Sequence, residues 1–123
     1  MEDKHTESNN ARRQAFIYTL LNRADSMGDH AVRIRFEIER GTESTLAGAL
    51  TDYYICSKPK DYLQRLDFLK ESLNVLGDDW LLLFYDNLEE EFSSATILPY
   101  NQWSIFTEDV QGHFNFIDNP YAS

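Results

Sequence analysis

Residues 30–40, HAVRIRFEIER, decide the fold that the sequence predicts, because they show the clearest alternation of apolar and polar side chains in the chain. On a strand, charged residues would share one face, and the other face would carry Val32, Ile34, Phe36 and Ile38. Such strict alternation is typical of a half-buried strand in an antiparallel sheet. The stretch therefore predicts a β-strand.

A helix is expected before this strand. Asn9 and Asn10 can cap a helix over residues 11–27, and Gly28 would end it. Apolar residues recur there at the three- and four-residue spacing of one helix face, namely Phe16, Ile17, Leu20, Leu21, Ala24 and Met27. This face is predicted to pack on the sheet.

Residues 57–77, SKPKDYLQRLDFLKESLNVLG, predict a second helix after the strand. Ser57 can cap it, and Pro59 would sit in its first turn, where a missing N–H costs nothing. Gly77 would close it. The predicted buried stripe is Tyr62, Leu66, Leu69, Leu73 and Leu76.

The remaining segments complete an α+β fold. Residues 46–56 fit either a short helix or a second strand. Short alternations over 94–106 and 113–117 indicate further strands, and Pro99 would make the first of these irregular or an edge. We therefore predict about three helices packed on a small antiparallel sheet.

Length and composition fit a single folded domain. The chain has 123 residues, of which 42% are hydrophobic, and we expect a disordered tail over 1–10 followed by one domain over 11–123. The polar tail lacks the apolar run of a signal peptide, and the longest apolar run, 80–85, is far shorter than a membrane span. A cytoplasmic protein with no membrane partner is expected. Cys56, the only cysteine, excludes an internal disulfide.

The acidic residues are distributed unevenly. Residues 1–76 contain 12 acidic and 11 basic residues, whereas residues 77–123 contain nine acidic residues and no Lys or Arg. Ordinary soluble surfaces mix both signs of charge, because like charges repel one another. Nearly all of the net charge of −10 therefore lies in the last third of the chain.

Residues 78–92, DDWLLLFYDNLEEEF, are the densest part of this acidic region. As a strand, 80–85 would be buried on both faces. As a helix, most of the acidic residues separate from most of the apolar ones, with Leu82, Leu83 and Glu91 as exceptions, so we favour the helix. Asp78 or Asp79 would cap it. On one such helix Asp78 and Glu90 would lie about 18 Å apart, a charge density similar to that of a nucleic-acid backbone.

Motifs for catalysis or metal binding are missing from the sequence. The histidines are scattered, the glycines occur singly, and the acidic block lacks the spacing of a calcium-binding loop. We therefore expect a protein that is not an enzyme and has no cofactor or metal. Direct nucleic-acid binding is not expected either, because Glu37 and Glu39 would share a strand face with Arg33 and Arg35.

In size and charge distribution the chain resembles bacterial DNA-mimic proteins and the immunity proteins of toxin systems. The resemblance implies an inhibitor or regulator whose partner is a basic protein, either a DNA-binding protein or a nuclease toxin. The carboxylates predicted to contact this partner are Asp78, Asp79, Asp86, Glu89, Glu90, Glu91, Glu108 and Asp109. Aromatic anchors are expected beside them at Tyr85, Tyr100 and Trp103.

A second hypothesis assigns the acidic residues to solubility alone. The chain would then be an immunity protein or a structural subunit, monomeric or homodimeric, that binds through an apolar surface such as residues 96–106. Binding that weakens steeply with salt would favour the first hypothesis, and binding that is nearly independent of salt would favour the second.

Overall fold

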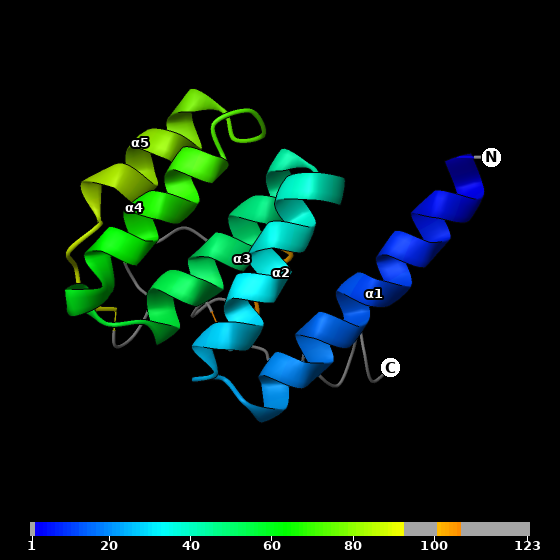
Figure 1. Ribbon diagram of the computed structural model, residues 1–123, viewed down its shortest axis with the longest axis horizontal. Helices are drawn as coiled ribbons and strands as arrows, with labels where there is room; N and C mark the ends of the chain where they lie inside the picture. The colour runs from blue at the N-terminus through cyan, green and yellow to red at the C-terminus, as the bar shows by residue number, and fades with distance from the viewer. Residues whose placement is uncertain (1, 93–100, 107–123) are drawn as a thin grey trace.

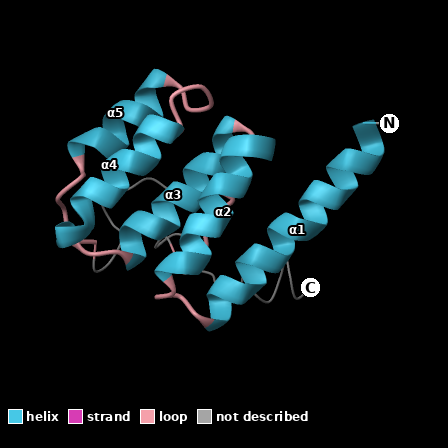
Figure 2. Cartoon of the chain, in the orientation of Figure 1, coloured by secondary structure: helices cyan, strands magenta, loops and turns pink. Residues whose placement is uncertain are grey.

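The structure, a computed structural model, describes residues 2–92 and 101–106, with side chains from residue 8 onward, and in this part helices are joined by turns and loops (Figures 1 and 2). No strand occurs in it, so the predicted α+β fold with an antiparallel sheet is wrong. The elements are α1 Glu2–Asn22, α2 Met27–Arg40, α3 Glu43–Cys56, the 3-10 helix η1 Pro59–Asp61, α4 Tyr62–Glu71 and α5 Asp78–Asp86.

The stretch predicted as a strand is helix α2. Its buried residues recur at three- and four-residue spacing, as one face of a helix requires: His30, Arg33, Ile34, Phe36 and Glu37. Two of them are charged, and Val32, one of the expected core residues, is 53% exposed. The alternation led to the wrong prediction because the charged side chains of Arg33 and Glu37 occupy part of the buried face, whereas the apolar side chain of Val32 faces solvent.

The boundaries between α1 and α2 also differ from the prediction. The first helix ends at Asn22, and Gly28 lies in the first turn of α2 instead of ending a helix. Ser26 caps α2, because its Oγ accepts a hydrogen bond from the Asp29 N–H. Helix α1 begins at Glu2, and the disordered tail over 1–10 stays a prediction.

Helix α3 is the centre of the molecule and lies between α2 and the α4–α5 pair (Figure 1). Ten consecutive residues, Thr45 to Tyr54, are buried, which is the pattern of a helix surrounded on all sides. Thr42 and Thr45 form a reciprocal capping box at its start. The ambiguous residues 46–56 are therefore the most buried helix in the described part of the chain.

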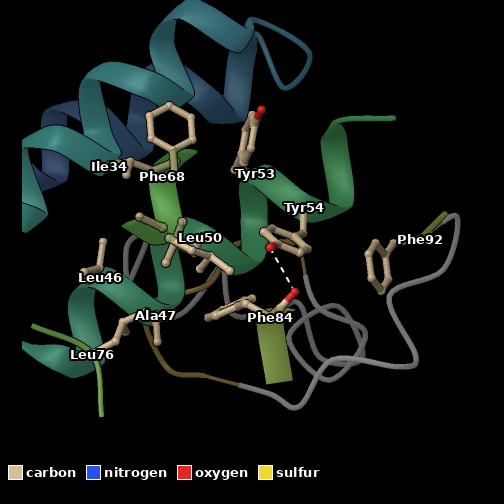
Figure 3. Packing of buried hydrophobic residues seen from close by; sticks show 12 residues of the cluster. Ile34, Leu46, Ala47, Leu50, Tyr53, Tyr54, Phe68, Leu76, Phe84 and Phe92 are labelled. Atoms are coloured by element: carbon tan, nitrogen blue, oxygen red, sulfur yellow. Dashed lines mark hydrogen bonds between the residues drawn. The ribbon is translucent and has the colours of Figure 1, made fainter. Parts of the chain in front are cut away.

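Aromatic side chains join α3 to α4 and α5 in the main core (Figure 3). The Tyr53 ring meets Phe68 edge to face with centroids 5.1 Å apart, and the Tyr54 ring lies 5.0 Å from Phe84. The buried Tyr54 hydroxyl donates a 3.0 Å hydrogen bond to the Phe84 carbonyl (Figure 3). Both tyrosines thus hold α3 to the second half of the chain.

The second predicted helix is divided into η1 and α4, and α4 buries a different face. Leu69 and Leu76 are buried as expected, but Leu73 is 61% exposed and Tyr62 is also exposed. The buried face of α4 instead consists of Arg65, Phe68 and Leu69. Compared with the prediction, α4 is rotated about its axis so that Arg65 is fully buried. The prediction failed because a charged residue was not expected to face the core.

Arg65 is held by oxygen atoms from two segments. Its guanidinium donates to the Tyr54 carbonyl at 3.1 Å and to the Ser57 Oγ at 3.0 Å, both at the end of α3. It also donates to the carbonyls of Leu88 at 2.8 Å and Glu90 at 3.0 Å, beyond α5. Ser57 therefore accepts from Arg65 and does not cap the helix that follows it.

Residues 101–106, here called the strap, cross α3 in an irregular conformation with no strand. The Asp52 carboxylate of α3 accepts hydrogen bonds from the Ser104 hydroxyl at 2.7 Å and from the Ile105 and Phe106 N–H groups at 2.9 Å. It also pairs with Arg33 at 2.6 Å. The expected strand over 94–106 is wrong in this part, whereas 93–100 and the predicted strand over 113–117 lie outside the described residues.

A glycine and a second buried ion pair complete the contact with the strap. Gly48 has no side chain where α3 meets Trp103, and a Cβ there would lie 2.6 Å from the Trp103 Cβ. Arg13 of α1 forms a two-point pair with Glu37 of α2, at 2.7 and 3.0 Å, and its guanidinium lies 5.6 Å from the Trp103 ring centroid. The strap therefore links α1, α2 and α3.

Within residues 2–92 and 101–106, no helix combines the length and apolar character that crossing a membrane requires.

Replacing Asp52 with Asn should destabilise the protein strongly. The change leaves Arg33 buried without its counter-charge and faces the strap N–H groups with a weaker acceptor, so we expect a loss of about 3 kcal/mol or more in the free energy of unfolding. Urea denaturation measures the loss. Asp67→Asn, at an exposed position of α4, should change stability by less than about 0.5 kcal/mol. Equal effects of the two changes would contradict the central role of Asp52.

Two glycine-to-alanine changes should act in opposite directions. Gly48→Ala forces the strap away from α3 and should cost about 1–3 kcal/mol. Gly28→Ala adds a Cβ with no atom within 4 Å and should stabilise α2 by about 0.4–1 kcal/mol. Thermal unfolding of both variants checks the signs, and a neutral Gly48→Ala would show that the strap does not pack closely.

His30 should make stability depend on pH. Its Nε2 lies 2.7 Å from the Ala24 carbonyl, and its buried Nδ1 has no partner. Burial lowers its pKa below the ordinary value of 6.5, although the bond to Ala24 acts in the opposite sense. The unfolded chain therefore binds this proton at higher pH than the folded chain, and stability falls as the pH drops below about 6.5.

The variant His30→Gln keeps a donor for the Ala24 carbonyl and cannot titrate. Its free energy of unfolding, measured by urea denaturation between about pH 8 and pH 5, should fall less steeply than that of the wild type. Identical pH profiles would show that His30 does not contribute.

Candidate protein-binding surface

Helix α5 and the turn after it carry the acidic block, and six carboxylates there are exposed. The predicted helix is confirmed over Asp78–Asp86, with Phe84 buried on its inner face. We call the exposed set the acidic surface, and it consists of Asp78, Asp79, Asp86, Glu89, Glu90 and Glu91.

The N-terminus of α5 is built differently from the prediction. Gly77 is the capping residue, and neither Asp78 nor Asp79 caps the helix. Instead, Glu43 in the first turn of α3 accepts a 2.6 Å hydrogen bond from the Gly77 N–H through its Oε2. Asp78 and Asp79 lie in the first turn, where the helix dipole favours negative charge.

The C-terminus of α5 changes the expected row of charges. The helix ends at Asp86 with Asn87 as its cap, so Glu89 to Glu91 are not on it. The expected 18 Å row from Asp78 to Glu90 along one helix is therefore wrong. Only three of the six carboxylates, those of Asp78, Asp79 and Asp86, are on helix α5.

Arg65 fixes the turn that carries the other three carboxylates. Its buried guanidinium donates hydrogen bonds to the carbonyl oxygens of Leu88 and Glu90, while the side chains of Glu89, Glu90 and Glu91 remain exposed. Phe92 closes the turn by packing in the core, with its ring 5.6 Å from the guanidinium of Arg65. The backbone of the acidic turn is thus anchored from inside.

The acidic surface is not neutralised within the described part of the chain. Ion pairs in residues 8–92 and 101–106 join other residues, and none includes a carboxylate of the acidic surface. The guanidinium of Arg65, which contacts the backbone of the acidic turn, directs its donors to carbonyl oxygens and to the Ser57 Oγ. The negative charge of this surface therefore remains open to a partner.

An apolar groove runs beside the acidic surface, between α4 and α5. Its volume is about 450 Å³. Leu73, Leu82 and Tyr85 are exposed by 61%, 55% and 60%, respectively. We call it the α4–α5 groove, and its lining residues are Leu66, Leu69, Lys70, Leu73, Asp78, Leu81, Leu82 and Tyr85.

The three predicted aromatic anchors have different positions. Tyr85 lines the groove, as an anchor for a partner would. Trp103 is in the strap and packs against the small cluster of Ile17, Leu20 and Ile105. Tyr100, together with the predicted carboxylates Glu108 and Asp109, lies outside the described residues.

Sequence reasoning missed the groove and the role of Arg65. The signal for the groove was the position of Leu82 and Leu83, which broke the separation of apolar and acidic residues on the predicted helix. Leu82 faces the groove and not the core. Nothing in the local sequence distinguishes Arg65 from an exposed arginine.

The chemistry of other candidate groups is limited by burial. Burial raises the pKa of the Cys56 thiol to about 12, so the thiol stays protonated and is a poor nucleophile at neutral pH. Among residues that the structure describes, no three His, Cys, Asp or Glu side chains are grouped closely enough to hold a metal ion.

Comparison of the chain with protein-family models, with curated proteins and with solved structures found no match.

Proposed function

We propose that this chain is a small acidic binding protein that inhibits or regulates a basic, nucleic-acid-binding protein. The observation that carries the proposal is the acidic surface, whose six carboxylates are exposed and unpaired with any cation of the described residues. Solubility alone does not require such an excess of one sign on one surface.

The mechanism is competition for the partner's basic surface. Proteins that bind nucleic acid present Lys and Arg to phosphates, and carboxylates at high local density attract the same side chains. A negative surface also accelerates encounter with a positive one, toward about 10⁸–10⁹ M⁻¹s⁻¹ at low salt. No regular phosphate-like spacing is needed for this mechanism, which agrees with the end of α5 at Asp86.

The second candidate function is an immunity protein or interaction subunit that binds through apolar contacts alone. The exposed side chains of Leu73, Leu82 and Tyr85 favour it. The two candidates differ in their salt dependence, which is steep for carboxylates that attract a basic protein and nearly flat for apolar contact.

Reversing two charges should separate these candidates. Asp86→Lys with Glu90→Lys places positive charge on the acidic surface, and the fold should survive because Lys at the C-terminus of α5 complements the helix dipole. We expect at least about tenfold weaker binding to a panel of purified basic nucleic-acid-binding proteins, measured by surface plasmon resonance at several salt concentrations. Wild-type protein should also displace duplex DNA from the panel members that it binds.

The matched control is Asp25→Lys with Glu39→Lys, which changes net charge by the same amount at two exposed positions outside the acidic surface. Its binding should stay within about threefold of the wild type. Equal losses in both double variants would show a non-specific charge effect, and unchanged binding in a folded Asp86→Lys/Glu90→Lys variant would refute the proposal.

A further inference from the structure

We infer that the α4–α5 groove binds an amphipathic α-helix of the partner, with the helix's apolar stripe in the groove and its basic residues beside α5. The basic character of the helix rests on the proposed function, whereas its apolar stripe rests on the groove alone. Apolar contact in the groove would give the complex most of its affinity.

The dimensions of the groove fit a short helix. Its walls are α4, with 10 residues, and α5, with 9 residues. At 1.5 Å per residue these walls are about 14–15 Å long, enough for about three turns of a bound helix. Its lining is mostly leucine, with Tyr85 at one wall. Three turns present about four apolar side chains at helical spacing.

Charge is arranged beside the groove on the α5 side. At 100° per residue, Asp86 lies about 40° and Asp79 about 60° around α5 from Leu82. Asp78 itself lines the groove, and Lys70 lines it from α4. A bound helix would therefore meet carboxylates along one flank and a cation on the other, so its own basic residues would be placed over α5.

The observations favour a helix as the bound element. Residues 2–92 and 101–106 contain no strand, so this part offers no sheet edge to which an extended peptide could add. An apolar groove between two helices is instead a common binding site for an amphipathic helix, which inserts its side chains at positions i, i+3, i+4 and i+7.

A second copy of the chain fits this surface poorly. Two copies joined symmetrically through the groove would bring two acidic surfaces together, and like charges repel. A copy could instead present the groove between α1 and α2, which contains Arg12, Arg35 and Arg40, but Glu39 and Glu71 line that groove as well. A basic helix from another protein is the better complement.

A labelled peptide tests the inference with the full chain. The probe is a helical peptide of about 14 residues with Leu at i, i+3, i+4 and i+7 and Lys on one flank, and the control peptide has the same composition in scrambled order. Fluorescence anisotropy should show binding of the first peptide at least about tenfold tighter than that of the second. Equal binding of the two peptides, or no binding of either, overturns the inference.

Paired variants test the location. Leu73→Ser with Leu82→Ser removes two exposed groove residues and should weaken peptide binding at least about tenfold. The control, Val32→Ser with Leu63→Ser, removes side chains exposed by 53% and 60% outside this groove and should leave binding within about twofold. Equal losses in both double variants, or none in the first, overturn the inference.

Two results separate this inference from the proposed function. If Leu73→Ser/Leu82→Ser has no effect while Asp86→Lys/Glu90→Lys still weakens binding to the basic proteins, the groove inference falls and the proposed function stands. If only the leucine changes weaken binding, the proposed function falls and the groove binds an uncharged amphipathic helix. A dimer seen by sedimentation equilibrium and abolished by Leu73→Ser/Leu82→Ser would overturn the inference by making a second copy the occupant.

Discussion

The buried ion pair between Arg33 and Asp52 sets the arrangement of the described fold. A charge in the protein interior is costly unless it is paired and its remaining hydrogen bonds are made. The Asp52 carboxylate meets this condition only when α2 supplies Arg33 and the strap supplies Ser104 and the N–H groups of Ile105 and Phe106. One carboxylate on the central helix thus specifies the positions of α2 and the strap together.

Two further buried arginines also join helices through polar contacts. Arg13 joins α1 to α2 through Glu37, and Arg65 joins α4 to the end of α3 and to the turn after α5 through carbonyl oxygens. Pairs of this kind add little net stability compared with apolar packing, but losing one partner is expensive. Arg65 is different, because its partners are neutral oxygens, so its burial removes one positive charge from the outer surface near α5 without removing a negative one.

These buried arginines explain what the sequence predicted and what it did not. The helix over 78–86 was predictable because its acidic and apolar residues separate at helical spacing around Phe84. Residues 30–40 were assigned to a strand because Arg33 and Glu37 were expected in solvent, although each has a partner far away in the chain. The rotation of α4 has the same cause in Arg65. Long-range pairing of charges cannot be read from local periodicity, and neither can the groove that the rotated α4 forms with α5.

The position of Arg65 connects this packing to the proposed binding. Because it holds the carbonyls of Leu88 and Glu90, the acidic turn has a backbone fixed before any partner arrives, and little ordering entropy remains to oppose association. The same helix pair leaves Leu82 and Tyr85 exposed in the groove. Carboxylates attract a basic partner over distances of about 8–10 Å, whereas apolar contacts act only when surfaces touch. A surface that carries carboxylates and exposed leucines side by side can therefore use them for different purposes. The carboxylates set the rate of encounter, and the leucines set the lifetime of the complex.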